Sequence, residues 1–388
     1  MSRLFLLVSI ILVSIVCFLP KNAERAYADD VGISVEETLD TIDLSAFDEL
    51  LRELGDNNGF VCGIRKTVED ILEGKNVFDF SYFLSLLGEV FLGELKNIAP
   101  HLIAILVIGI LFGLLKNTTF GFSKVDVTKV TYVVCYGSMI AVLAHLAATS
   151  VVETKQAIGY LQKMADGCFP VLITLVAAVG GTTSGAVFHP LVLTFGAVLL
   201  QFVTTAVIPL FSAALVFGLV GQFTDAFKLD KLAKTIRTFC FWSLGSIFGL
   251  FSTLLAAEGI VGANMDGLAA RGAKFALSSY VPVVGSYIKD TFDIVVAGCL
   301  AVKNALGLCA VVLLIASIVG PIVRIGVLSL GLKLTAGILE PVGEEKMSNA
   351  LSATADSFKI LLSAVACAGF SGIVFLMTII FVCNVGFV

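Results

Sequence analysis

The sequence predicts an all-α, polytopic membrane protein made of three tandem, parallel repeats of about 110 residues. Hydrophobic residues make up 58% of the chain and charged residues 14%, with a mean hydropathy of +1.00. Soluble domains carry about 25% charged residues. Prolines recur at spacings of 109 and 112 residues, at Pro100, Pro209 and Pro321, and each precedes a second apolar segment. A repeat of this length determines the architecture, so the chain is expected to consist of three copies.

The amino terminus has the pattern of a secretory signal peptide over residues 1–28. Arg3 supplies a positive charge, Leu4 to Leu19 are almost entirely apolar, and Ala26-Tyr27-Ala28 matches an A-x-A cleavage site. An uncleaved first helix is the alternative, although its sixteen residues fall short of the roughly 20 that a membrane span needs. Both interpretations place Asp29 outside the cytoplasm.

Residues 29–59 form an acidic segment that is expected to be extracytoplasmic. Residues 29–76 contain thirteen acidic and four basic side chains, a net charge of −9. This charge repels nucleic acid and anionic lipid headgroups, so no nucleic-acid partner is expected. Leu44, Phe47, Leu51 and Leu54 fall at helical spacing and give one apolar stripe. The stripe either packs on the rest of the chain or docks a partner protein.

The repeats are expected at residues 60–168, 169–280 and 281–388. Pro170 and Pro282 lie 39 residues before Pro209 and Pro321, and copy one lacks the equivalent proline. Each copy divides into four apolar segments, which in copy two are residues 169–179, 187–207, 209–221 and 237–257. The first is too short to cross a bilayer, so the first two are expected to form a re-entrant or short hairpin. The five prolines are predicted to be hinges, and those opening the third segments to start helices. The last two segments of each copy then give at least six crossings.

Loop charges give the orientation. Residues 116–129 and 222–237, between the third and fourth segments, each carry a net charge of +2, whereas residues 153–166 and 258–274 are neutral. By the positive-inside rule the first pair is cytoplasmic and the second external. Equivalent loops on one side make the repeats parallel, unlike the inverted repeats of many transporters. The third such loop is acidic and departs from the pattern.

Pairs of small residues recur on the fourth segment of every copy. They are Gly137 with Ala141, Gly245 with Gly249, and Ala364 with Ala368. Lipid provides no hydrophobic drive for helix association, so helices approach through small residues. This segment is therefore predicted to be the helix contact between copies or between subunits, and the latter would give a homo-oligomer.

Three basic residues interrupt the apolar segments of copy three: Lys303, Arg324 and Lys333. Ionisable groups within the membrane are candidates for function, so these side chains could line an aqueous conduit for anions or polar solutes. The alternatives are that they extend to the interface or pair with an acid elsewhere in the fold.

Catalytic, cofactor-binding and metal-binding residues are not predicted. The nine cysteines include no C-x-x-C motif, and the three histidines have no metal-ligand spacing. The glycine-rich residues 180–185 lack the G-K-[ST] ending of a phosphate-binding loop.

Behind the signal and the acidic external segment, residues 169–178 (FPVLITLVAA) lead to Phe188-His189-Pro190. In these features the whole chain resembles the stage III sporulation protein AE family of endospore-forming Firmicutes. The resemblance implies a multi-pass subunit of the mother-cell membrane that is needed for forespore development. Its partners would be the other stage III A proteins and, indirectly, the forespore stage II protein Q, in a channel or secretion-like complex. A stand-alone secondary transporter for a small polar or anionic solute is the alternative function, with Lys303, Arg324 and Lys333 as its substrate site.

Overall fold

The structure is a computed structural model that describes residues 80–118, 125–178, 196–223, 229–254, 285–341 and 345–381. The signal peptide, the acidic segment and Pro282 lie outside these ranges. All elements in the described ranges are helices, which confirms the predicted all-α class. They are α5 (Phe80–Thr118), α6 (Val125–Ala178), the π-helical turn η2 (Val203–Val207), α8 (Ile208–Phe223), α10 (Gly285–Leu339) and α11 (Glu345–Phe381). Residues 196–202 continue into η2 and α8 as one helix, and residues 230–254 form another.

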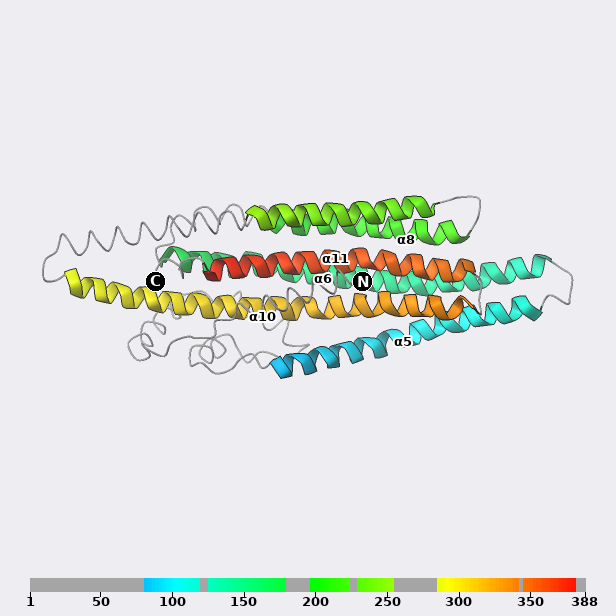
Figure 1. Cartoon of the computed structure of the whole chain (residues 1–388), viewed down its shortest axis with the longest axis horizontal. Helices are drawn as coiled ribbons and strands as arrows, with labels where there is room; N and C mark the ends of the chain where they lie inside the picture. Colours follow the sequence, from blue (N-terminus) through cyan, green and yellow to red (C-terminus); the bar gives the residue numbers. More distant parts are fainter. Residues whose placement is uncertain are drawn as a thin grey trace.

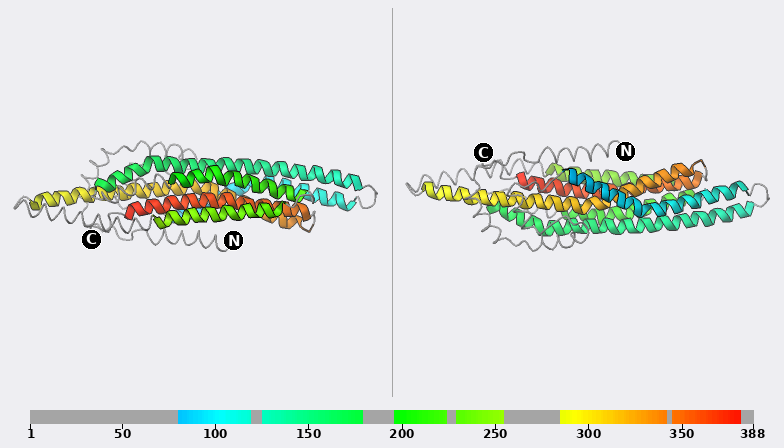
Figure 2. Two further views of the ribbon diagram at one scale, coloured as in Figure 1. Left: turned by 90° about the horizontal axis from the view of Figure 1, so that it is seen from above. Right: turned by 90° about the horizontal axis from the view of Figure 1, so that it is seen from below.

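The helices form one elongated bundle of three helical hairpins (Figure 1). These pair α5 with α6, the helix Gly196–Phe223 with residues 230–254, and α10 with α11. The helix ends that flank the three hairpin turns lie at the same end of the bundle in both views of Figure 2. At that end the Tyr132 hydroxyl of α6 donates a hydrogen bond to the Gln222 carbonyl, 3.4 Å away. The hairpins therefore run in the same direction.

The longest helices exceed the thickness of a bilayer. α6 has 54 residues and α10 has 55, so each is about 80 Å long at 1.5 Å per residue, against a hydrocarbon core of about 30 Å. Among the described residues five helices are long and apolar enough to cross a membrane: Leu87–Lys116, Lys129–Ala178, Gly196–Phe223, Val296–Leu339 and Glu345–Met377. The helix of residues 230–254, counted among the six expected crossings, is not one of the five.

The prediction that a proline starts the third segment's helix is wrong in all three copies. Pro100 and Pro321 lie well inside α5 and α10, and Pro209 lies within the helix Gly196–Phe223. A proline ring clashes with the carbonyl four residues earlier, which for Pro209 belongs to Thr205. Thr205 lies in η2, where the wider π-helical turn relieves the clash without ending the helix.

The expected hairpin between the first two segments is also wrong in copy three, whereas in copies one and two its turn would fall outside the described ranges. In copy three these segments and the third form the single helix α10, and in copy two the second and third form Gly196–Phe223. Residues 153–166, predicted as an external loop, lie inside α6, which also continues through the repeat boundary at residue 169 and past Pro170. Short apolar segments thus join into long helices because neither proline nor a few charges stops a helix that is packed on its neighbours.

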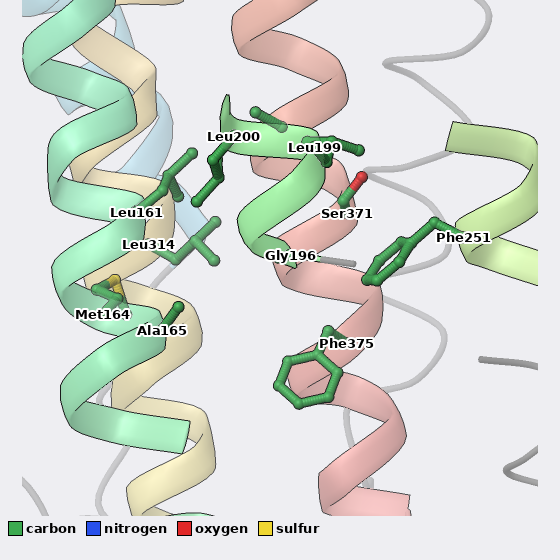
Figure 3. A pocket seen from close by; sticks show the side chains of 12 residues that line it. Leu161, Met164, Ala165, Gly196, Leu199, Leu200, Phe251, Leu314, Ser371 and Phe375 are labelled. Atoms are coloured by element: carbon green, nitrogen blue, oxygen red, sulfur yellow. The ribbon is translucent and has the colours of Figure 1, made fainter. Parts of the chain in front are cut away.

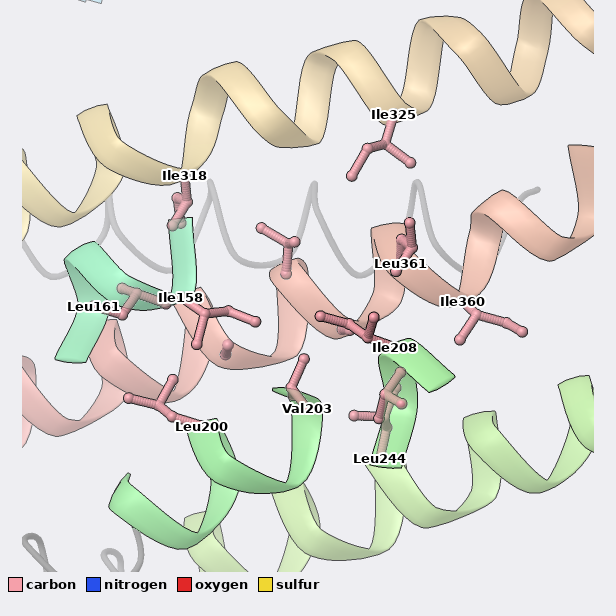
Figure 4. Close-up of a cluster of buried hydrophobic side chains, with 14 of the residues drawn as sticks. Ile158, Leu161, Leu200, Val203, Ile208, Leu244, Ile318, Ile325, Ile360 and Leu361 are labelled. Carbon is pink, nitrogen blue, oxygen red and sulfur yellow. The ribbon is translucent and has the colours of Figure 1, made fainter. Parts of the chain in front are cut away.

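α11 forms the centre of the bundle. It contacts α6, α8 and α10 and is the most buried of the five apolar helices. Aliphatic side chains from the surrounding helices meet around it, including Leu161, Val203, Leu244 and Ile318 (Figure 4). Burial of one such side chain stabilises a fold by about 1.5–3 kcal/mol relative to exposure to water. The gain is smaller where the alternative to burial is contact with lipid.

Glycines set the distances between the packed helices. A Cβ added to Gly109 of α5 would lie 2.5 Å from Leu339, and one added to Gly372 of α11 would lie 2.6 Å from Leu314, both on α10. Further close contacts of this kind join Gly331 to Leu102 and Gly369 to Ile318. These glycines let the backbones of α5, α10 and α11 approach.

Tyr136→Phe tests the link between the first two hairpins. The buried Tyr136 hydroxyl donates to the Leu219 carbonyl at 2.7 Å, and its ring contacts Phe223. We expect a loss of about 1 kcal/mol in the free energy of unfolding in mixed micelles, since one neutral hydrogen bond is removed and the ring is kept. Tyr160→Phe, on the part-exposed surface of α6, is the matched control and should change stability by less. Equal effects would contradict a specific role for the Tyr136 hydroxyl.

Candidate functional site

The three basic residues predicted to line a conduit do not form one site. Lys303, Arg324 and Lys333 all lie on α10. Lys303 is 21 residues from Arg324, about 30 Å along the helix, and Arg324 is nine residues from Lys333, about 13 Å. The structure gives each side chain a different environment.

Lys303 is fully buried where α10 passes the end of α11. Its Nζ donates a hydrogen bond to the Ile380 carbonyl at 3.0 Å. The last carbonyls of a helix lack partners within the helix and carry a partial negative charge, so a cation here stabilises the end of α11. This contact indicates a structural role for Lys303.

Arg324 belongs to an ion cluster with one acid from each of two other helices. Its Nη1 forms a close ion pair with Glu153 Oε1 of α6, and its Nε lies 3.9 Å from Glu94 Oε2 of α5. The three side chains are 20–26% exposed. We call Glu94, Glu153 and Arg324 the ion cluster. Sequence analysis considered pairing with a distant acid as an alternative, and the structure supports it for Arg324.

The ion cluster lies level with the middle of an uncharged helix. Ser329 of α10 donates to the Ala355 carbonyl of α11, and three residues further along α11 the ring of Phe358 contacts Phe211. Arg324 is therefore within about two helical turns of the level of Phe211. Phe211 is close to the midpoint of Gly196–Phe223, a 28-residue span without any charged side chain. The ion cluster thus lies near mid-depth of that span.

Lys333 and Arg237 lie nearer the hairpin turns than the ion cluster does. Lys333 Nζ lies 3.0 Å from Asp356 Oδ1, which also accepts from Lys359 at 2.6 Å. Arg237 Nη1 donates to the Ala353 carbonyl at 2.7 Å and so links the second and third hairpins. Residues 222–237, which end at Arg237, were predicted to be a cytoplasmic loop.

Two histidines stack between α5 and α6. The ring centroids of His101 and His145 are 5.8 Å apart with an angle of 24° between the planes. His101 Nδ1 is buried and has no hydrogen-bond partner among the described residues. Both histidines lie well inside their helices.

The small pairs differ between the copies. Gly137, Ala141, Gly245 and Gly249 are all exposed, and a Cβ on any of these three glycines would have nothing within 4 Å. Ala364 and Ala368 are buried in the bundle core. Contact through the first two pairs therefore remains a prediction for a second molecule, while the third pair packs within the chain.

Comparison with known proteins places the chain in a family. Residues 62–386 match the family described as stage III sporulation protein AE. The chain belongs to this family. The stage III sporulation protein AE of Bacillus subtilis (strain 168) is 27% identical over 265 residues, which cover 68% of this chain and 66% of that relative, slightly under two thirds. No solved structure matches.

The family match and the five apolar helices establish a sporulation protein of the membrane.

A hollow among Leu161, Phe251, Leu314 and Phe375 has almost wholly apolar walls, with Ser371 as its polar contribution (Figure 3). None of the three basic residues of α10 lines it. This hollow does not have the polar groups that a site for an anion or sugar needs.

The acids of the ion cluster are the functional candidates that sequence analysis missed. Residues 153–166, which include Glu153, were predicted to be an external loop, and no role was predicted for Glu94. The signal was present, because each acid lies beside a long, mostly apolar run: residues 98–115 begin four residues after Glu94, and residues 130–152 directly precede Glu153. Two acids beside such runs and one arginine inside a third apolar helix form the pattern of a buried ion cluster.

Proposed function

We propose that this chain is a non-enzymatic, multi-pass subunit of a sporulation channel or secretion-like complex that joins mother cell and forespore. The match to the stage III sporulation protein AE family over residues 62–386 carries the proposal. The partners would be the other stage III A proteins and, indirectly, stage II protein Q. The protein would lie in the mother-cell membrane with the mature amino terminus outside the cytoplasm.

The arrangement of the bundle is consistent with a scaffold. Three hairpins in one direction leave long apolar faces exposed, with Val107, Leu111, Phe239 and Trp242 among the outward side chains. These faces suit contact with lipid or with other membrane subunits. The separation of Lys303, Arg324 and Lys333 gives less support to a stand-alone transporter, because one small solute cannot contact all three.

Deletion of the gene in its spore-forming host tests the proposal. We expect cells that complete engulfment but fail to form heat-resistant spores, because the forespore would lack the complex. An epitope-tagged copy should restore spores and co-purify with other stage III A proteins from sporulating membranes. Normal sporulation of the deletion strain, or a functional tagged protein that co-purifies with none of these partners, would contradict the proposal.

Two variants separate the proposed role from the alternatives. Lys333→Gln should leave sporulation intact in a scaffold, since Asp356 keeps Lys359 as its partner, but should abolish it if Lys333 lines a conduit. Removal of residues 29–57 should abolish co-purification, with membrane insertion intact, if the acidic segment docks partners. Retained co-purification would mean that the segment packs on its own chain.

A further inference from the structure

We propose that the ion cluster of Glu94, Glu153 and Arg324 binds one exchangeable proton near mid-depth of the membrane bundle. This inference goes beyond the scaffold role and does not depend on it. It rests on the number of charges that meet there, on their contacts, and on the pairing of the nearest other cations of α10 and α11, Lys333 and Lys359, with Asp356.

The ion cluster contains two carboxyl groups and a single guanidinium group. Arg324 makes its close contact with Glu153, while Glu94 lies farther away, with Nε to Oε2 at 3.9 Å. Glu94 Oε2 is buried and accepts no hydrogen bond from a described residue. With both acids ionised, the cluster has one negative charge in excess, and one of its oxygens is poorly stabilised.

Among the described residues no second cation contacts the cluster, and the nearest two on α10 and α11, Lys333 and Lys359, both pair with Asp356. The helix Gly196–Phe223 has no charged residue, and α11 has none after Lys359. On α5 and α6 the nearest basic residues are Lys96 and Lys155, and both are exposed. The other titratable groups on these two helices near the cluster are the exposed Glu89 and, about two helical turns away, Tyr160 and the stacked pair His101 and His145.

A proton neutralises the cluster better than a metal ion does. Sodium and other hard cations require several oxygen ligands, whereas the cluster presents two carboxyl groups next to a guanidinium that repels cations. A proton bound to one of the two carboxyl groups needs no such shell and turns that group into a hydrogen-bond donor. The proton belongs to the coupled pair of acids rather than to either residue alone.

Infrared spectroscopy of the full-length protein in lipid bilayers at neutral pH tests this site. The wild type should show the carbonyl stretch of about one protonated carboxyl group per chain, shifting on exchange into D₂O. Glu94→Gln and Glu153→Gln should each abolish the band, because one carboxylate then pairs with Arg324. Arg324→Gln should roughly double it, because neither acid keeps a cation partner.

Glu89→Gln is the matched control, since Glu89 is an exposed acid on the same helix as Glu94. It should leave the band unchanged. The two glutamine variants at the cluster retain an Arg324 ion pair and are expected to fold. A wild-type protein without the band, a band that survives both Glu94→Gln and Glu153→Gln, or a sodium-dependent rise in unfolding temperature that these two variants remove would overturn the proposal.

Discussion

Arg324→Leu is expected to lower the free energy of unfolding by about 3 kcal/mol in mixed micelles. The substitution leaves Glu94 and Glu153 without their cation while they remain about three quarters buried. Removing one member of a buried ion pair typically costs about 3–5 kcal/mol, and partial exposure places this cluster at the lower end of that range. Denaturation by a graded mole fraction of ionic detergent gives the measurement.

Two further variants identify the cause of that loss. Arg324→Leu combined with Glu94→Gln and Glu153→Gln should recover most of the stability, because no uncompensated charge is left. Lys333→Leu should cost less than about 1 kcal/mol, since its pair with Asp356 is more than one third exposed and Lys359 remains. A triple variant as unstable as Arg324→Leu would show that the side chain acts through packing rather than charge.

Gly369→Leu is expected to destabilise the α10–α11 hairpin by about 1–3 kcal/mol. A side chain at this buried glycine would overlap Ile318 of α10, so the two backbones must separate. Packing is the main force between helices in lipid, and the centre of the bundle depends on this contact. The unfolding measurement in mixed micelles reports the effect.

Gly245→Leu is the control because a side chain at Gly245 would meet nothing within 4 Å. It should be neutral or slightly stabilising, since glycine is a poor helix former. Ile318→Ala in the Gly369→Leu background should recover part of the lost stability by making room for leucine. If Gly369→Leu and Gly245→Leu had equal effects, the close approach of α10 and α11 would not matter for stability.

Sequence reasoning predicted the helical membrane class because composition alone decides it. It also predicted the shared direction of equivalent loops, since their flanking helix ends now lie at one end of the bundle (Figure 2). The predicted helix boundaries were wrong at the prolines. Pro100 and Pro321 were read as helix starts, but the helices continue through them because neighbouring helices hold the backbone in place.

The ion cluster could not be predicted from the sequence for a related reason. Arg324 was correctly identified as unusual, yet its partners lie 171 and 230 residues earlier in the chain, at Glu153 and Glu94. Local spacing cannot pair residues on three different helices. The close-packing glycines were missed because a glycine such as Gly331 differs from exposed Gly245 only in what faces it. The equivalence of the three copies remains a prediction.

Site-directed cysteine labelling tests the central claim, which is that the three hairpins cross the membrane in the same direction. Single cysteines would replace exposed Lys129, Lys231 and Glu340 beside the hairpin turns, and exposed Ala178 at the far end of α6, in a background without native cysteines. A membrane-impermeant maleimide would be applied to intact cells and to inside-out vesicles. We predict labelling of the first three positions only in inside-out vesicles and of Ala178→Cys only in intact cells. Labelling of Lys129→Cys and Lys231→Cys from opposite sides would contradict the parallel arrangement.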